Sequence, residues 1–490
     1  MRNLKIQIIT HLFLWYRRAC NVDGTATERY IAYHEAKAKG GWGLIITEDY
    51  NVAPEGHGFS CTAGLWNDDQ IESHTELPRR VHEQGATIIA QIYHCGRQTH
   101  TSAIPEGCHT RSSSAIACPF GDEVPIPFTT EEVKEMVGKY GDTALRAKKC
   151  GFDGVEIHGA HGYLITQFFS PYSNKRLDEY GGNFWNRTRF AREIVADVRR
   201  KCGDDFIIGM RISADEFVEG GLTIEDSKAI ALMMEEAGVD LIHVSVANYL
   251  SVDLNVASAY TSHGWFTDWA KEIKELLHIP VITVSRINDP FLADEILASG
   301  KADLVAMGRA SLCDPDMPNK AKEGRFEDIR RCIGCNDGCE GVLFTDNAFT
   351  CVLNPELGNE YRGEIPKAEV PKKVAVVGAL YGTSVKGHET VMPLVALHAH
   401  AQRGAIALGE RSHARFGRYS VHAGPRQGCR QGHQKKFLHK VFYYRCYRLF
   451  QPLSSVGIGT CPCATDTIFR KYTLNLRNAH NLFPKKTENA

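Results

Sequence analysis

The sequence lacks any apolar run long enough to span a membrane. Its first apolar stretch, residues 6–16, is short. Arg17 and Arg18 follow it, where a signal peptide would have small residues for cleavage. We therefore expect a cytoplasmic protein without a membrane partner.

A disulfide framework is also absent. The 490 residues include 16 cysteines, but their spacings are scattered and do not resemble those of small secreted domains. A reducing compartment and a metal site explain these thiols better. With 43% hydrophobic and 23% charged residues, the chain has ordinary globular composition and is long enough for two or three domains. These values predict an intracellular enzyme.

Acidic residues are scarce in the last part of the chain. Residues 381–490 contain 17 Lys and Arg against four Asp and Glu, whereas residues 1–380 contain 40 against 54. The net charge of −1 therefore conceals a strong asymmetry. A basic tail is one signature of a nucleic-acid-binding arm. The abrupt change of composition where this tail begins favours a shifted reading frame or a degenerate gene instead. We therefore expect no nucleic-acid partner.

Four cysteines have the spacing of a metal-cluster site. Cys332, Cys335, Cys339 and Cys351 follow the pattern C-x2-C-x3-C-x11-C, with glycines between the first three. Four such thiolates hold an iron–sulfur cluster. Four cysteines also suit structural zinc, but zinc ribbons usually pair two C-x2-C knuckles, and this segment has one. The spacing favours a [4Fe–4S] cluster over zinc.

Short apolar runs alternate with amphipathic segments between residues 41 and 310. The runs are rich in Ile, Val and Leu and lack strict alternation, which is typical of strands buried on both faces of a parallel sheet. Capping-box patterns at Thr129–Glu132 and Thr223–Asp226 predict helix starts between them. With a possible first strand at residues 4–10, these units predict an α/β fold, a (β/α)8 TIM barrel. An open doubly wound sheet is the alternative, because the sequence does not show strand order. The seven predicted strands are Gly43–Thr47, Thr87–Tyr93, Gly154–His158, Ile207–Ile212, Leu241–Val246, Val281–Ser285 and Leu304–Met307.

Polar residues follow these strands at their carboxyl ends, where barrel enzymes carry their active sites. Any one of them could be a solvent-facing loop residue, but five strand ends with polar groups favour a shared site. Two arginines and a glycine after the last two strands predict a phosphate cradle of guanidinium and backbone N–H groups. The residues are Gln91 and His94; His158, His161 and Tyr163; Arg211; Ser285 and Arg286; and Gly308 and Arg309.

Two longer motifs carry a family resemblance. Residues 155–171 read VEIHGAHGYLITQFFSP and residues 174–183 read NKRLDEYGGN. These segments resemble the flavin-barrel signature of the Old Yellow Enzyme superfamily. Together with the cysteine motif, residues 21–379 resemble its iron–sulfur branch. That branch includes 2,4-dienoyl-CoA reductase, 2-enoate reductase, trimethylamine dehydrogenase and bile-acid-inducible NADH:flavin oxidoreductases.

The resemblance implies an FMN site at the mouth of the barrel. Gln91 and Arg211 match positions that hydrogen-bond the flavin ring, where a cation stabilises the reduced, anionic flavin. The FMN phosphate would be held by residues after the last two strands, namely Ser285, Arg286, Gly308 and Arg309.

The resemblance also implies a substrate site. His158 and His161 would grip the oxygen of an α,β-unsaturated carbonyl compound, and Tyr163 would protonate Cα after hydride addition at Cβ. The substrate could be a 2-enoate, an enoyl-CoA or an oxo-steroid or bile-acid-like molecule. In the family, NADH or NADPH reduces FAD and the cluster relays the electrons to FMN. A homo-oligomer is compatible with the resemblance.

Both ends of the chain depart from the family. After residues 372–379 the family continues with a glycine-rich turn for the FAD pyrophosphate, but here Leu380 and Tyr381 stand where that turn needs close backbone approach. We therefore expect the FAD site to be lost in this chain. A shifted reading frame or a degenerate gene would explain why the match stops inside a motif. A genuine basic interaction tail is the alternative.

These observations divide the chain into five parts. They are an atypical segment (1–20), an FMN-binding barrel (21–325), an iron–sulfur segment (326–365), the start of a Rossmann domain (366–380) and a basic tail expected to be disordered (381–490). The preferred function is an NAD(P)H-dependent flavin and iron–sulfur oxidoreductase that reduces C=C bonds. The alternative is a catalytically impaired or non-catalytic product of a damaged gene.

Overall fold

The computed structural model describes residues 19–342 and 349–363. They belong to one compact unit, Met1–Glu410, and the second unit, Arg411–Ala490, lies outside the described residues. Also outside them are the possible first strand at residues 4–10, the start of the Rossmann domain at 366–380 and the whole basic tail.

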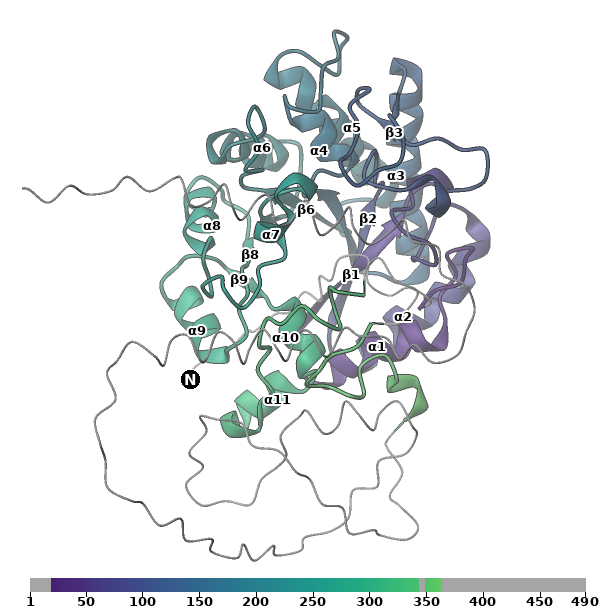
Figure 1. Cartoon of the computed structure of the whole chain (residues 1–490). Helices are drawn as coiled ribbons and strands as arrows, with labels where there is room; N and C mark the ends of the chain where they lie inside the picture. The colour runs from purple at the N-terminus through teal and green to yellow at the C-terminus, as the bar shows by residue number, and fades with distance from the viewer. Residues whose placement is uncertain (1–18, 343–348, 364–490) are drawn as a thin grey trace, which may run out of the picture. The chain divides into compact units, whose positions relative to one another are not determined.

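Seven parallel strands form the centre of the fold, with helices around them (Figure 1). Each of the seven strands expected from the sequence is present, with bounds that agree to within a few residues. They are β1 (Leu44–Asn51), β2 (Thr87–Tyr93), β5 (Gly154–Gly159), β6 (Ile207–Ser213), β7 (Leu241–Ser245), β8 (Val281–Val284) and β9 (Leu304–Ala306).

The order of the strands decides between the two folds that the sequence left open. The sheet runs β1-β2-β5-β6-β7-β8-β9, so every strand pairs in parallel with the next strand of this sheet along the chain. A doubly wound sheet reverses its order at a switch point, and the described residues contain no reversal. The α/β barrel is therefore confirmed and the open sheet is wrong.

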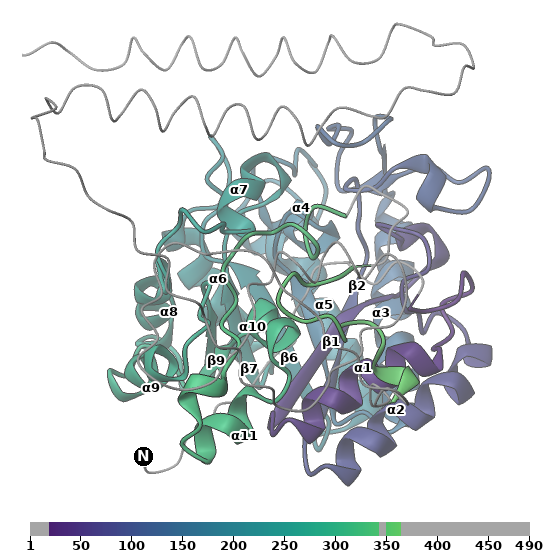
Figure 2. The same cartoon turned by 60° about the horizontal axis from the view of Figure 1, so that its bottom comes forward.

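Helices connect successive strands and cover the outside of the sheet (Figure 2). The two predicted capping boxes are present, since Thr129 with Glu132 starts α3 and Thr223 with Asp226 starts α6. None of the described helices is both long and apolar enough to cross a membrane. The helices are α1 (Glu28–Lys39), α2 (Ile71–Glu83), α3 (Thr130–Cys150), α4 (Leu164–Phe169), α5 (Phe184–Cys202), α6 (Ile224–Glu236), α7 (Val252–Asn255), α8 (Thr267–Lys274), α9 (Pro290–Ala298), α10 (Gly308–Cys313) and α11 (Met317–Lys322).

Shorter elements occupy the loops. Two residues each form β3 (Arg111–Ser112) and β4 (Ile126–Pro127), which pair with one another after β2. The short 3-10 helices are η1 (Pro54–Gly56), η2 (Asp68–Gln70), η3 (Thr101–Ala103), η4 (Tyr249–Ser251), η5 (Phe326–Asp328) and η6 (Glu360–Arg362).

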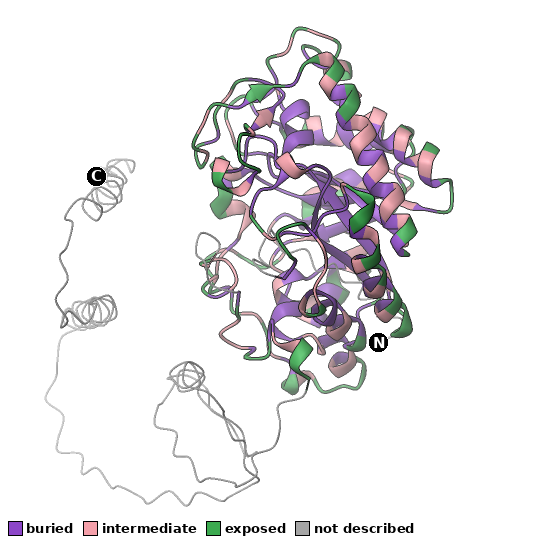
Figure 3. Ribbon diagram, turned by 90° about the vertical axis from the view of Figure 1, so that its right-hand side faces the viewer, coloured by how far each residue is buried: buried purple, intermediate pink, exposed green. Residues whose placement is uncertain are grey.

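The strands of the seven-stranded sheet are mostly buried and appear purple in Figure 3, whereas the short strand β4 is exposed. β1 is buried at all eight positions although it contains Glu48 and Asp49. The register of its pairing with β2 shifts between Ile46 and Asp49, and the pairing then resumes as far as Asn51. The strand therefore extends beyond its predicted end at Thr47. Polar side chains inside a strand are typical of a barrel interior that serves a site.

The cysteine segment is tied to the barrel by Asp314, which follows α10 and is fully buried. Its carboxylate accepts hydrogen bonds from Lys320 Nζ at 2.8 Å and from the backbone N of Arg330 at 2.8 Å. Farther along, Asn354 Nδ2 donates to the carbonyl of Leu312 at 2.7 Å. These bonds hold the segment against the end of α10.

Candidate active site

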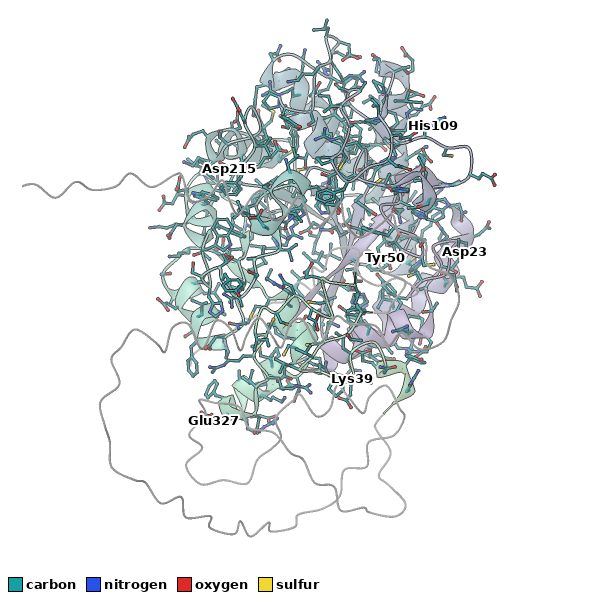
Figure 4. All side chains as sticks on the ribbon, in the orientation of Figure 1. Asp23, Lys39, Tyr50, His109, Asp215 and Glu327 are labelled. Carbon is teal, nitrogen blue, oxygen red and sulfur yellow. The ribbon has the colours of Figure 1, made fainter. Side chains whose placement is uncertain are left out.

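The predicted site residues come from one end of the barrel. Gln91 lies on β2, His158 on β5 and Arg211 on β6. The parallel register places His158 beside Arg211, and Arg211 beside His243 on β7. Because parallel strands all end at the same edge of the sheet, the loops after them meet there. Figure 4 shows the side chains that crowd this space, with Asp215 labelled in the loop after β6.

A cavity lies at this end of the barrel, lined by residues of β6 and of the loops after β7, β8 and β9. All four residues expected to bind a phosphate line it, as does Arg211. The four are Ser285, Arg286, Gly308 and Arg309.

The cavity contains buried donors without acceptors. Among the described residues, Nε and Nη1 of Arg211, Nε of Arg286 and Nε1 of Trp265 have no hydrogen-bond partner. Unsatisfied buried polar groups are costly and therefore rare in folded proteins. An anionic ligand with ring acceptors would satisfy them, so this donor set fits FMN.

Two of these arginines are oriented by backbone contacts. Arg286 has a positive φ of 51° and donates to the carbonyl of Thr261. Arg309 Nη1 donates to the carbonyl of Ala257 at 2.7 Å and to Oδ1 of Asn336 in the cysteine segment. Arg309 lines both this cavity and the one that the four cysteines line, and so does Cys332.

The two predicted substrate-binding histidines are in direct contact. His161 Nδ1 lies 3.2 Å from His158 Nε2, and His161 Nε2 lies 2.7 Å from Oγ of Ser245. Ser245 Oγ also accepts a hydrogen bond from Arg211 at 3.2 Å. His158 Nδ1 accepts from the backbone N of Ala160, which assigns its proton to Nε2. His158 then donates to His161, and His161 donates to Ser245.

Burial keeps both histidines neutral. Desolvation lowers the pKa of His158 to about 3 and that of His161 well below its usual value. Each ring therefore presents one N–H rather than a full charge. His161 also has a positive φ of 62°, a strained conformation for a residue other than glycine. Its backbone is held by Ser213 Oγ, which accepts from His161 N at 2.9 Å, and by a bridge to Asn248.

Tyr163 stands beside this pair and is fully buried. Its ring packs edge-on against His158, with centroids 4.9 Å apart, and against Tyr93 at 5.3 Å. Its hydroxyl lies 3.0 Å from the hydroxyl of Tyr249 in the loop after β7. Desolvation raises the pKa of Tyr163 well above its usual value, so the phenol is protonated at neutral pH.

Gln91 lies on β2 and is fully buried. Its Nε2 donates to Oε1 of Glu156, whose Oε2 is 2.9 Å from His243 Nδ1. Its Oε1 has no partner among the described residues. Burial raises the pKa of Glu156 to about 8, so this carboxyl shares a proton with its neighbours instead of carrying a lone buried charge.

The four predicted cluster ligands line one cavity. Two sulfur atoms accept backbone N–H groups, Cys332 from Gly334 and Cys351 from Leu353, both at 3.4 Å. The buried thiol of Cys313 donates to Cys351 and lowers its pKa to about 6. In the described part of the chain, no three His, Cys, Asp or Glu side chains are close enough to share one metal ion. The donor set, four cysteines around one cavity, fits a cluster.

Five residues of this region were missed by the sequence analysis. Ser245 and Tyr249 lie at the end of β7 and in the loop after it, a position typical of barrel active-site residues. Glu156 and His243 lie inside apolar strands, and a charged residue within such a run was a usable signal. Cys313 had none, because its neighbour Cys351 lies far along the chain.

Comparison with known proteins agrees with this arrangement. Residues 14–328 match the NADH:flavin oxidoreductase / NADH oxidase family. An NADH oxidase of Thermoanaerobacter brockii is 44% identical over 382 residues, which are 76% of this chain and 58% of that protein. A cinnamate reductase of Clostridium sporogenes is 34% identical over 76% of this chain and 60% of its own length.

Solved structures give the same result. A 2-naphthoyl-CoA reductase in complex with 2-naphthoyl-CoA superimposes with a TM-score of 0.70 at 30% sequence identity, over 74% of this chain and 57% of that one. The chain thus spans somewhat more than half the length of these relatives. Since the matched family covers most of the described barrel, the chain belongs to the NADH:flavin oxidoreductase / NADH oxidase family.

Proposed function

We propose that this chain is an FMN-dependent oxidoreductase that reduces the C=C bond of α,β-unsaturated carbonyl compounds. The observation that carries the proposal is the cavity in which Arg211, Arg286 and Arg309 converge, next to the His158–His161 pair. Three arginine N–H donors there are unpaired among the described residues, namely Nε and Nη1 of Arg211 and Nε of Arg286. The relatives named for cinnamate and 2-naphthoyl-CoA support an enoate or a conjugated thioester as substrate.

Each side chain has a role in this reaction. FMN, when bound, supplies the hydride for Cβ of the substrate. In the structure the N–H of His158 donates to His161 and the N–H of His161 donates to Ser245. When a substrate binds, these two N–H groups would turn to its carbonyl oxygen and stabilise the negative charge that develops on it. Tyr163 gives its phenolic proton to Cα. Arg211 on β6 binds the flavin ring, as does Gln91 on β2, two strands away in the sheet.

We also propose the cofactor order and the domain limits that the sequence suggested. Residues 21–325 would hold FMN and residues 326–365 a [4Fe–4S] cluster on Cys332, Cys335, Cys339 and Cys351. NAD(P)H would be the source of electrons. The expected loss of the FAD site concerns residues outside the described range, so its test is whether NADH or only dithionite supports turnover.

The purified chain should bind FMN in a one-to-one ratio, and Arg309→Ala should weaken that binding. A charge-assisted hydrogen bond contributes roughly 1.5–3 kcal/mol, so its loss should raise the Kd for FMN by about 10- to 100-fold. The recovery of FMN fluorescence on release measures the Kd. Arg79→Ala, at an exposed position on α2, is the control and should change nothing. An unchanged Kd in Arg309→Ala would remove Arg309 from the phosphate site.

The chain isolated without oxygen should contain iron and acid-labile sulfide at about four each per chain. Cys339→Ser should lose most of both, because Cys339 is one of the four thiols around the cavity. Cys108→Ser is the control, since Cys108 lies in a loop that contributes nothing to that cavity. One zinc per chain without iron would show that the zinc alternative is right.

A further inference from the structure

Tyr163 and Tyr249 form a pair that crosses from the buried site toward the surface. Tyr163 is 0% exposed, whereas Tyr249 is half-buried and packs edge-on against Phe120, which is 51% exposed. The two hydroxyls are 3.0 Å apart and the ring centroids 5.8 Å. A hydrogen bond between two phenols at this distance can carry a proton in either direction.

The pair is built by the fold and does not arise from a chance approach of two loops. His161, two residues before Tyr163, forms a parallel bridge with Asn248, the residue before Tyr249. Asn248 is fixed in turn, because its Nδ2 donates to Glu216 at 3.0 Å and its backbone N donates to Ser251 Oγ at 3.0 Å. The loops after β5 and β7 are therefore held in register at the two tyrosines.

We propose that Tyr249 is a positioning residue that returns a proton from solvent to Tyr163 after each turnover, an inference that rests on the proposed function. When Tyr163 protonates the substrate, its O–H bond breaks and a Cα–H bond forms. The O–H bond of Tyr249 then breaks as a new O–H bond forms on Tyr163, and solvent reprotonates Tyr249. The hydride that forms the Cβ–H bond comes from reduced FMN, so protons and electrons balance.

The physical need for this step follows from the burial of Tyr163. A tyrosinate left in a fully buried position has lost its water, which is a large cost for a charge. Desolvation is the largest cause of the raised pKa of Tyr163, in agreement with that cost. A neighbouring phenol moves the charge off Tyr163 by giving up its own proton, and the charge then lies on Tyr249, which solvent neutralises.

This role predicts a difference between the first turnover and the later ones. Resting Tyr163 already carries its proton, so Tyr249→Phe should leave the first reoxidation of reduced FMN by an enoate near the wild-type rate. Steady-state turnover should fall by about tenfold, less than the ~10²–10⁴ expected when a direct proton donor is removed. The solvent deuterium isotope effect should then be larger in the steady state than in the first turnover. Phenylalanine keeps the ring contacts with Phe120 and Tyr163 and removes only the hydroxyl.

The experiment uses the full chain loaded with FMN, in a stopped-flow instrument without oxygen, with dithionite at a level where wild-type turnover no longer depends on it. Tyr260→Phe is the matched control, because Tyr260 is fully exposed and far along the loop from Tyr249. Tyr249→His, or added imidazole buffer with Tyr249→Phe, should restore part of the steady-state rate by supplying another proton carrier.

The outcomes separate the two proposals. An unchanged steady-state rate and isotope effect in Tyr249→Phe would overturn the relay. An equally slow first turnover, or a change confined to KM, would overturn it too, since either indicates a packing or substrate-binding role. Wild-type chain that binds FMN but reduces no enoate would overturn the proposed function itself, and the relay with it.

Discussion

Replacing Tyr163 with phenylalanine should slow the reoxidation of reduced FMN by a 2-enoate by about 10²–10⁴-fold, the range typical of a lost proton donor. The variant keeps the ring that packs against His158 and Tyr93 and loses only the hydroxyl. Reduction of the bound flavin by dithionite should stay at the wild-type rate, because no proton at Cα is needed for it. Stopped-flow absorbance of the flavin measures both half-reactions.

Tyr180→Phe provides a control with the same chemical change at another buried tyrosine. The Tyr180 hydroxyl donates to Glu193 at 2.7 Å, outside the residues of the active site. This variant should reduce the enoate at the wild-type rate. If Tyr163→Phe reduces the enoate as fast as the wild type, another group protonates Cα and the role assigned to Tyr163 is wrong.

Gly40→Ala should be among the most destabilising single-atom changes in the barrel. Gly40 ends α1, and a Cβ built there would lie 1.7 Å from the backbone oxygen of Pro315. That oxygen already accepts the indole N–H of Trp42 at 2.7 Å. The backbone at Gly40 and the backbone at Pro315 must move apart to make room for the methyl group. We therefore expect the free energy of unfolding to fall by about 3 kcal/mol, the upper part of the range for overpacked sites. Urea unfolding measures the change.

A second glycine shows that the effect is steric. Gly138 lies within α3, and nothing stands within 4 Å of a Cβ placed there. Gly138→Ala should therefore stabilise the protein by about 0.5–1 kcal/mol, because alanine loses less backbone entropy in a helix. If Gly40→Ala and Gly138→Ala unfold at the same urea concentration, the backbone around Pro315 moves aside without lowering the free energy of unfolding.

The strands could be predicted where burial alone determines the sequence. β2 has the predicted bounds, Thr87–Tyr93, because its run is apolar up to the site and a loop follows at once. β1 was predicted too short, since Glu48 and Asp49 resemble a loop although both are buried. β8 was predicted one residue too long, since it stops at Val284 before the left-handed turn at Arg286. The amino-acid sequence alone does not show at which residue the backbone leaves the strand conformation.

The site could be predicted only in part for a related reason. His158, His161 and Tyr163 belong to one short motif, so sequence proximity was enough to group them. The contact of Tyr163 with Tyr249 joins residues 86 positions apart, and it depends on the bridge between two loops. Likewise, Arg309 was expected to face a phosphate, but its bond to Asn336 in the cysteine segment depends on how that segment folds back.

The contact of Arg309 with both cavities has a thermodynamic consequence. Its side chain lines the proposed flavin cavity and also bonds to the loop that carries the cysteines. Linkage is reciprocal, so the factor by which an ordered cysteine loop raises the affinity for FMN is the factor by which bound FMN would raise the affinity of that loop for the proposed cluster. With both proposed cofactors, maturation would therefore be cooperative: binding of the first would favour binding of the second, and loss of either would weaken the other.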